Sequence, residues 1–250
     1  MAIISALDPS LKRRTLMKKV VAAGFAVCAC VALANDWYVD PTVPDDSHDG
    51  TSSNVVSATV GPKRTLAGVM AAGVGVGDGD TVWLLPGEHK EGTMNGGLNR
   101  LYVTQKNLKV KSLSGNPFDT SIVGEYDVGV TNNFTGADSV SCVKFAKAAK
   151  DCIVEGVMLR DATARYLGDT KEYGGGIYDQ SMSCWAINCV FSNCSARAGG
   201  GLYGGSAVRC RFIHCAAGNT STGSAIHTAK QAAFCLFQDC DWNSSGARGV

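Results

Sequence analysis

The sequence predicts an all-β fold, a right-handed parallel β-helix with a short N-terminal α-helical cap. Three observations predict it. A phrase built on glycines and a later phenylalanine recurs in the second half of the chain. Short apolar runs divided by turn residues fill the region before it. The 250 residues include 30 glycines but only 6 prolines, a composition that suits many tight turns.

Residues 1–34 have the pattern of a signal peptide. A basic stretch precedes a fifteen-residue apolar run, Val20 to Ala34, which ends in the A-x-A cleavage pattern Ala32-Leu33-Ala34. A membrane-spanning helix needs about 20 apolar residues, so this run is too short to be one. We expect the mature chain to begin near Asn35. Lipid attachment at Cys30 is the alternative.

Removing the leader changes the charge balance. The first 34 residues hold five basic side chains and one acid, so 18 basic and 21 acidic side chains remain, a net charge of −3. No basic patch is left to bind nucleic acid. No second apolar run of spanning length follows, so we expect no transmembrane helix in the mature chain and an exported protein.

Residues 35–90 are expected to form the N-terminal cap and the first coils. A short strand, YVD, and a polar loop precede an amphipathic helical stretch over residues 65–72, with Leu66, Val69 and Met70 on one face. The turn sequence GDGD and the buried strand TVWLLPG follow. A helix at this place would close the end of stacked strands and cover their core and edge amides.

Residues 91–250 are expected to form the parallel β-helix coils. The runs NLKVKSLSG, TSIVGEY, SVSCVKF and CIVEGVMLRD are strand-like and are divided by glycine, asparagine or aspartate. The sequence ends at GARGV, where another coil would begin, which is what a fragment of a longer protein would show.

The second half of each repeat predicts an inward column, because side chains alternate along a strand. The expected inward residues are Ile187, Cys189 and Phe191, then Val208, Cys210 and Phe212, then Ala233, Cys235 and Phe237, with Val154, Gly156 and Met158 in a divergent earlier copy. Arg209 and Arg211 mark the outer face.

The spacing of the repeats matches one coil of a parallel β-helix. The phenylalanines recur after 21 and 25 residues, and the glycine phrases after 25 and 24. Periods of about 20 to 50 residues are typical of stacked architectures. Equivalent residues should therefore form ladders with the strand spacing of about 4.7 to 4.9 Å.

The paired motifs resemble the GG-[AG]-I and F-x-x-N repeat of the chlamydial polymorphic outer membrane proteins, within the pectin-lyase-like superfamily. The glycine motifs begin at Gly175, Gly200 and Gly223, and the aromatic motifs begin at Phe191, Phe212 and Phe237. The resemblance implies a surface location and an adhesive role. The family's asparagine is replaced by Cys194, Cys215 and Cys240, whereas Asp161 keeps a polar residue in the earlier copy.

The cysteines predict two ladders, Cys189, Cys210 and Cys235, and Cys194, Cys215 and Cys240. One interpretation is that they are small apolar groups stacked under tight corners. An exported protein meets an oxidising compartment, so disulfides between coils are an alternative. A metal site is a further alternative, although columns on separate coils do not converge tetrahedrally.

Tyr178, Tyr203 and His227 follow the inward aliphatic residues of the glycine phrases and should point outward. Such a column of flat side chains suits stacking on the sugar rings of a polymer. The alternative is that the rings stack on each other or under a loop and stabilise the sheet.

The insertion at residues 162–173 carries Arg165, Asp169, Lys171 and Glu172, directly after Arg160 and Asp161. Insertions in repeat proteins fall on loops and often carry function. A pectate-lyase-like enzyme needs an arginine or lysine base and acidic groups that hold Ca²⁺. A solvated loop is the alternative.

These observations favour an exported, non-catalytic adhesin or glycan-binding stalk. Its partner would be an extracellular polysaccharide or a host or cell-surface glycan, with no cofactor, no metal and no catalytic residue. The alternative is a secreted polysaccharide lyase or hydrolase of the pectate-lyase-like type, for which Ca²⁺ is the expected ion. The fold hosts both kinds of protein and does not decide between them.

Overall fold

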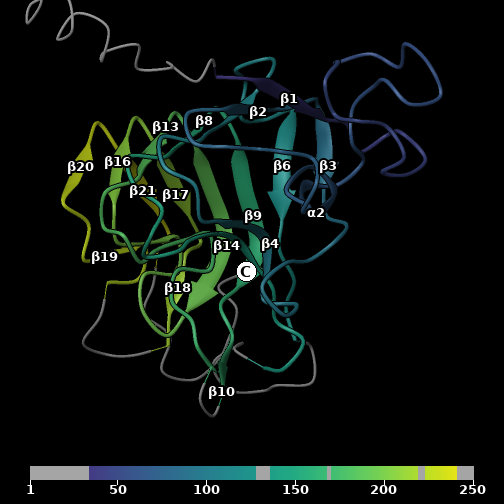
Figure 1. Cartoon of the computed structure of the whole chain (residues 1–250). Helices are drawn as coiled ribbons and strands as arrows, with labels where there is room; N and C mark the ends of the chain where they lie inside the picture. The colour runs from purple at the N-terminus through teal and green to yellow at the C-terminus, as the bar shows by residue number, and fades with distance from the viewer. Residues whose placement is uncertain (1–33, 128–135, 168–169, 219–222, 241–250) are drawn as a thin grey trace, which may run out of the picture. The chain divides into compact units, whose positions relative to one another are not determined.

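The computed structural model describes residues 34–127, 136–167, 170–218 and 223–240 (Figure 1). The expected signal peptide lies outside the described residues except for Ala34, and Asp169 and the last ten residues lie outside them as well. No helix in the described ranges has the length and apolar character needed to cross a membrane.

The described chain is almost entirely β-structure, arranged in three parallel sheets. Sheet A contains β1 (Asp36–Val39), β2 (Thr81–Leu84), β5 (Lys109–Ser112), β8 (Ile153–Glu155), β13 (Trp185–Ile187), β16 (Ser206–Val208) and β20 (Gln231–Ala233). Sheet B contains β3 (Gly87–His89), β6 (Thr120–Val123), β9 (Met158–Thr163), β14 (Val190–Ala196), β17 (Arg211–Ile213) and β21 (Leu236–Gln238), and β18 (Ala216–Ala217) pairs with the end of β14. Sheet C contains β4 (Asn99–Val103), β7 (Ser141–Phe145), β12 (Ile177–Asp179), β15 (Leu202–Tyr203) and β19 (Ile226–His227).

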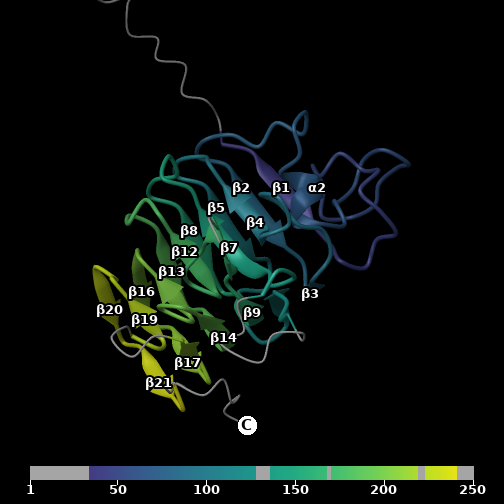
Figure 2. The same cartoon turned by 90° about the horizontal axis from the view of Figure 1, so that it is seen from below.

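From β2 onward the chain visits sheets A, B and C in turn, so each circuit lays one strand on each sheet. Figure 2 shows the strands following one another from β1 and β2 to β20 and β21. The predicted all-β, parallel architecture is confirmed at this level. One antiparallel hairpin, β10 (Tyr166–Leu167) with β11 (Thr170–Lys171), is inserted between β9 and β12.

The helix is shorter than the sequence predicts. It is the single turn α2 (Leu66–Val69), capped by Thr65, whose hydroxyl accepts a hydrogen bond from the amide of Gly68. Leu66 and Val69 are buried as expected. The helix ends at its C-cap Met70, whose ψ of 2° lies outside the helical range. Gly73, with a φ of 100°, follows in the turn beyond it, a conformation that glycine adopts without strain.

The core lies between the three sheets. Its largest side chains include Phe145, Phe191, Phe212, Leu101 and Leu159, all fully buried. The rings of Phe191 and Phe212 stack with centroids 4.5 Å apart at 5°, and the rings of Phe212 and Phe237 stack at 5.1 Å and 11°. Phe237, on the last described coil, is 49% exposed.

The predicted inward column is wrong at its first position in the three clear copies, whereas Val154 of the earlier copy is fully buried as predicted. Residues 187 to 191 do not form one strand, since Asn188 takes a left-handed φ of 50° and turns the chain from sheet A to sheet B. The side-chain alternation restarts after this corner. Ala186 and Ala207 therefore point inward, whereas Ile187, and Val208 and Ala233 in register with it, do not.

The divergent copy is aligned one residue later than the sequence predicts. Strand register pairs Phe191 with Leu159, not with Met158, and pairs Cys194 with Ala162, not with Asp161. Gly156, with a φ of 68°, occupies the corner in this copy, so the next inward residue is Val157. Arg209 and Arg211 are exposed as predicted.

The glycine phrases are required by close packing on the phenylalanine stack. A Cβ on Gly201 would lie 2.7 Å from Cδ1 of Phe212, and a Cβ on Gly176 would lie 2.6 Å from Cδ1 of Phe191. Each distance is well inside van der Waals contact. The repeated glycine and the repeated phenylalanine thus belong to one packing unit per coil.

Candidate ligand-binding face

Parallel register places five polar or aromatic side chains in one column on sheet C. Tyr102 of β4 pairs with Lys144 of β7, which pairs with Tyr178 of β12. Tyr178 pairs with Tyr203 of β15, which pairs with His227 of β19. We call these five residues the sheet C column.

The column points away from the core because of strand alternation. On β4, Leu101 and Val103 on either side of Tyr102 are fully buried, and on β7, Val143 and Phe145 on either side of Lys144 are fully buried too. The tyrosines and His227 are half-buried. The structure therefore places Tyr178, Tyr203 and His227 on the outer face, where the sequence predicts them.

The rings of the column contact each other. Tyr203 and His227 stack with centroids 5.2 Å apart at 18°, and Tyr178 meets Tyr203 edge to face at 5.5 Å and 88°. Tyr173 stacks on Tyr203 at 4.6 Å and 23°. Most ring faces are thus used within the cluster. What the column offers to a ligand is its rim, made of phenol hydroxyls and imidazole nitrogens.

The insertion covers one side of this column. It is a hairpin followed by Glu172, not a solvated loop throughout, since Glu172 is only 6% exposed. Its Oε1 lies 2.5 Å from Nζ of Lys144, which is itself only 7% exposed. Nζ of Lys144 also lies over the rings of Tyr102 and Tyr178, at 5.7 and 5.5 Å from their centroids.

The other charges of the insertion are placed differently. Arg165 donates from Nη2 to the carbonyl of Ser139 at 3.4 Å, and its own carbonyl accepts from the amide of Glu172. Lys171 pairs with Tyr166 along the hairpin. Asp169 lies outside the described residues. Only Glu172 of the four predicted residues is seen to join the column.

The surroundings of Tyr178 in the column change the pKa of its phenol. Burial raises the pKa of Tyr178, and the charge of Glu172 raises it further, while a hydrogen bond from Gln180 lowers it. The phenol therefore stays protonated at neutral pH and keeps a hydroxyl that can both donate and accept a hydrogen bond.

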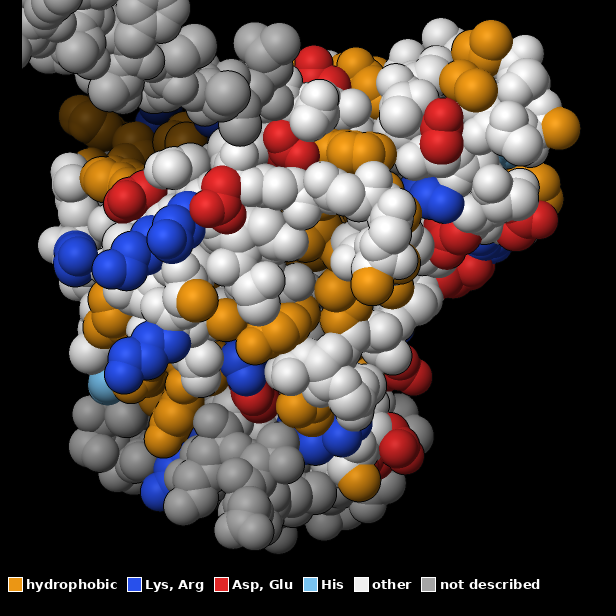
Figure 3. All heavy atoms as spheres, viewed as in Figure 1, with side chains coloured by type: hydrophobic (Ala, Val, Ile, Leu, Met, Phe, Trp, Pro, Cys, Tyr) orange, Lys and Arg blue, Asp and Glu red, His pale blue; other side chains and the backbone are white. Residues whose placement is uncertain are grey.

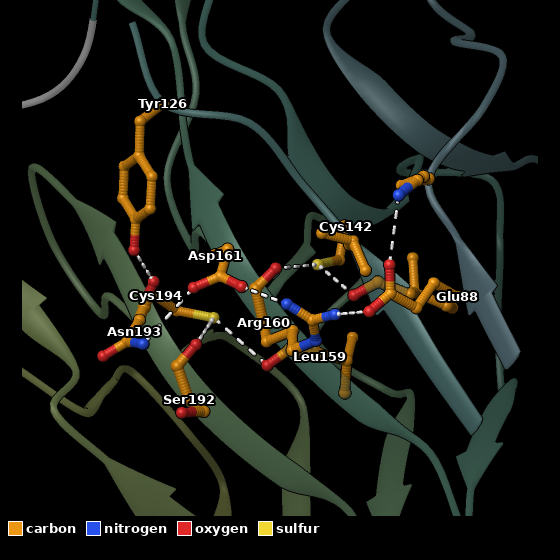
Figure 4. A network of polar contacts seen from close by, with 12 residues as sticks. Glu88, Tyr126, Cys142, Leu159, Arg160, Asp161, Ser192, Asn193 and Cys194 are labelled. Atoms are coloured by element: carbon orange, nitrogen blue, oxygen red, sulfur yellow. Dashed lines mark hydrogen bonds and ion pairs between the residues drawn. The ribbon is translucent and has the colours of Figure 1, made fainter. Parts of the chain in front are cut away.

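Arg160 and Asp161 belong to a different cluster, on sheet B (Figure 4). Arg160 pairs with Asp161 and, at 2.5 Å, with Glu88 two coils earlier. Asn193 donates to Asp161 at 3.3 Å, and the hydroxyl of Tyr126 donates to the carbonyl of Asn193. The predicted charge cluster is thus divided between two sheets, and the guanidinium of Arg160 is engaged by two carboxylates.

The cysteines lie on the inside of the corners. Cys189, Cys194, Cys210 and Cys215 are buried, and Cys235 and Cys240 on the last described coil are partly buried. Each follows a residue with left-handed φ: Asn188, Asn193, Arg209, His214, Phe234 and Asp239. Their thiols donate to backbone carbonyls of the same and the preceding coil, as from Cys210 to Val208 and Ala186, both at 3.4 Å.

The nine cysteines of the described residues are free thiols, so the structure forms none of the disulfides given as an alternative. Burial raises the pKa of Cys142 to about 12 and raises the pKa of Cys215 well above its usual value. These thiols are therefore poor nucleophiles. No group of three or more His, Cys, Asp or Glu side chains in the described ranges is placed to hold a metal ion.

On the face drawn in Figure 3, basic and acidic side chains are interspersed with apolar ones.

The sequence did not predict the roles of Tyr102, Lys144 and Tyr173. Local alternation could have predicted the outward orientation of two of them. Lys144 lies between the apolar Val143 and Phe145, and Tyr102 lies between apolar neighbours in RLYVT. Their relation to Tyr178 depends on register between coils that carry no recognisable repeat.

Comparison of the chain with protein-family models, with curated proteins and with solved structures finds no match.

Proposed function

We propose that this chain is an exported surface protein whose sheet C column binds an extended glycan without cleaving it. The observation that carries the proposal is the column itself: Tyr178, Tyr203 and His227 lie in register on adjacent parallel strands and are half-exposed. Rims of hydroxyl and imidazole groups repeat at the strand spacing of about 4.7 to 4.9 Å. A polymer whose hydroxyls repeat along its length is the chemical class that fits such a surface.

We also propose that the coils wind in the right-handed sense and that α2 closes their first end. Connections between parallel strands of one sheet are right-handed in about 98% of cases. The buried Leu66 and Val69 face the core beside β1 and β4, which begin sheets A and C. The export leader and the resemblance to polymorphic outer membrane protein repeats support the surface location.

The mode of binding differs from the sugar stacking that the sequence suggests. Because Tyr203 is already stacked on Tyr173 and His227, its faces are occupied. Hydrogen bonds from ring edges then carry the recognition, and the stacking keeps the edges in fixed positions. Rigid donors lose little conformational entropy on binding, which favours affinity.

The test is retention of the full chain on immobilised acidic and neutral polysaccharides, with the same samples assayed for unsaturated and reducing ends. Tyr178→Phe and Tyr203→Phe remove one hydroxyl each and keep the rings. A lost hydrogen bond of about 0.5 to 1.5 kcal/mol predicts roughly 2- to 12-fold weaker retention per hydroxyl. Tyr38→Phe, on β1 of sheet A, is the matched control and should change nothing.

Retention that both column variants leave unchanged would contradict the assignment of this face. Formation of new chain ends would contradict the hypothesis that the protein is non-catalytic. Unsaturated ends would favour a lyase, and reducing ends without unsaturation would favour a hydrolase. Abolition of that activity by chelation of Ca²⁺ would identify the lyase.

A further inference from the structure

Asp80 is a buried carboxylate at the start of β2, and it is 2% exposed. Its Oδ1 accepts a hydrogen bond from the backbone nitrogen of Asn35 at 2.7 Å. Its Oδ2 accepts from Nε1 of Trp37 and from the amide of Gly77, both at 2.8 Å. The carboxylate therefore joins the segment that enters β1, the indole of β1, and the turn before β2.

All three donors are neutral in the uncleaved chain, and no ion pair of the described residues includes Asp80. Burial alone raises the pKa of Asp80, but the hydrogen bonds from Asn35, Gly77 and Trp37 outweigh it and lower the pKa overall. The site thus holds a negative charge. A buried charge is costly unless a charge of opposite sign compensates it.

The residue that contacts this charge is the one that the leader pattern makes the first of the mature chain. Cleavage after Ala32-Leu33-Ala34 leaves Asn35 at the N-terminus. Ala34 and Asn35 are exposed, whereas Trp37 is buried. The distance of 2.7 Å from the nitrogen of Asn35 to Oδ1 is already that of a charge-assisted hydrogen bond, about 2.7 to 2.9 Å.

We propose that cleavage between Ala34 and Asn35 creates an α-ammonium group that forms an ion pair with the buried carboxylate of Asp80, and that this pair locks β1 onto β2. An export peptidase adds water across the peptide bond. The carbonyl carbon of Ala34 becomes a carboxylate, and the nitrogen of Asn35 keeps its electron pair and takes up protons to become the ammonium. The inference rests on the expected leader and is independent of the ligand proposed for sheet C.

The ion pair gives cleavage a structural consequence. In the uncleaved chain a neutral amide occupies the position of the counter-charge, so Asp80 is less well compensated there. After cleavage the ammonium of Asn35 pairs with a carboxylate that also accepts hydrogen bonds from Trp37 and Gly77. The ion pair therefore strengthens the connection between β1 and the turn before β2. We expect the precursor to hold β1 less firmly than the mature chain does.

The first measurement is the N-terminus of the full chain after expression in an exporting bacterium, read by mass spectrometry. We expect Asn35. The second is thermal unfolding of this mature protein against the uncleaved Ala34→Leu variant, whose bulky neutral side chain blocks cleavage without adding a charge, each with and without Asp80→Asn. The mature form should unfold at a higher temperature, and Asp80→Asn should remove that difference. Asp78→Asn, in the exposed part of the same turn, should preserve it.

The pH dependence gives an independent readout. An unpaired α-ammonium has a pKa of about 7.7 to 8.0, and pairing with Asp80 raises it. The extra stability should therefore be fully present below about pH 7.7 and be lost as the pH rises through the pKa of the folded state. Acylation of the α-amine should also be slower in the native protein than in urea, since a raised pKa leaves less of the amine deprotonated.

Three results would overturn the proposal: a mature N-terminus other than Asn35, equal unfolding temperatures for the mature and uncleaved forms, or equal acylation rates in native and unfolded protein. The acylation measurement needs no variant, so it decides the matter even when Asp80→Asn does not fold. None of these results bears on glycan retention by sheet C.

Discussion

Single residues with left-handed backbone set the corners of this protein. Asn188, Asn193 and Asp161 have φ near 50°, a region that asparagine and aspartate tolerate better than most residues. Arg209 and Phe234 occupy the same kind of position with less suitable side chains. The residue after each of the corners between sheets A and B, such as Cys189 or Cys210, then points into the core.

At this scale the phenylalanine stack should contribute strongly to stability. Phe212 is fully buried between Phe191 and Phe237, so Phe212→Ala removes two ring contacts and leaves a cavity. We expect a loss of about 3 to 5 kcal/mol in the free energy of unfolding, measured by urea denaturation. Phe234→Asn is the control: Phe234 is 88% exposed with a φ of 54°, so this variant should lose no stability.

The buried His89 should make the free energy of unfolding depend on pH. Burial lowers its pKa, although a hydrogen bond with the carbonyl of Leu85 opposes the change. Because the unfolded chain binds a proton near pH 6.5 and the folded chain does not, this contribution is full above about pH 6.5 and is lost as the pH falls. His89→Gln should reduce the slope of unfolding free energy against pH, on the acid side of about pH 6.5, by up to about 1.4 kcal/mol per pH unit. An unchanged slope would contradict the assignment.

At the scale of elements, the insertion shows what a local pattern leaves undetermined. Its charges are typical of a solvated loop, yet the chain forms the hairpin β10–β11 and buries Glu172 against Lys144 of β7. The two residues are 28 positions apart, and the fold brings Glu172, just after the hairpin, next to Lys144 on sheet C. The shortened helix α2 is a second case: the predicted helical stretch extends to residue 72, but the helix ends at Val69.

For the buried pair of Lys144 and Glu172, we expect a single substitution to cost more unfolding free energy than replacing both residues. Glu172→Ala leaves an ammonium buried without its partner, so a loss of about 3 to 5 kcal/mol in unfolding free energy is expected. The double variant Lys144→Met with Glu172→Leu replaces both charges by apolar groups and should recover most of that loss. Urea denaturation of the unsubstituted chain, the single variants Lys144→Met and Glu172→Leu, and the double variant gives the coupling energy. Additive losses would show that the pair is not coupled.

At the scale of the whole molecule, parallel coils place equivalent residues above one another. Ile177, Leu202 and Ile226 lie in register, as do Tyr178, Tyr203 and His227. The stacking protects the core along its length, and the last described coil is the exception. There Phe237, in register with the fully buried Phe212, is 49% exposed.

The difference in burial between the inner coils and the last described coil predicts which thiols react. Burial raises the pKa of Cys235, and a hydrogen bond with Cys215 raises the pKa of Cys240, so iodoacetamide without reductant should modify these two thiols slowly in the native protein. It should leave the seven buried cysteines of the described residues unmodified. In denaturant all nine cysteines of the chain from Asn35 onward should react, and mass spectrometry of that chain counts the added groups. Fewer than nine in denaturant would reveal disulfides and contradict the free-thiol arrangement.

The sequence by itself determined the all-β parallel class, the coil period, the outward column of Tyr178, Tyr203 and His227, and the phenylalanine stack. These follow from a fixed repeat length and from alternation within one strand, both of which are local. Only the tertiary structure decided which residues flank each corner, because a left-handed residue such as Asn188 restarts the alternation. It also decided the partners of Glu172, Arg160 and Asp80, since each contacts a residue more than 25 positions away that folding alone brings near.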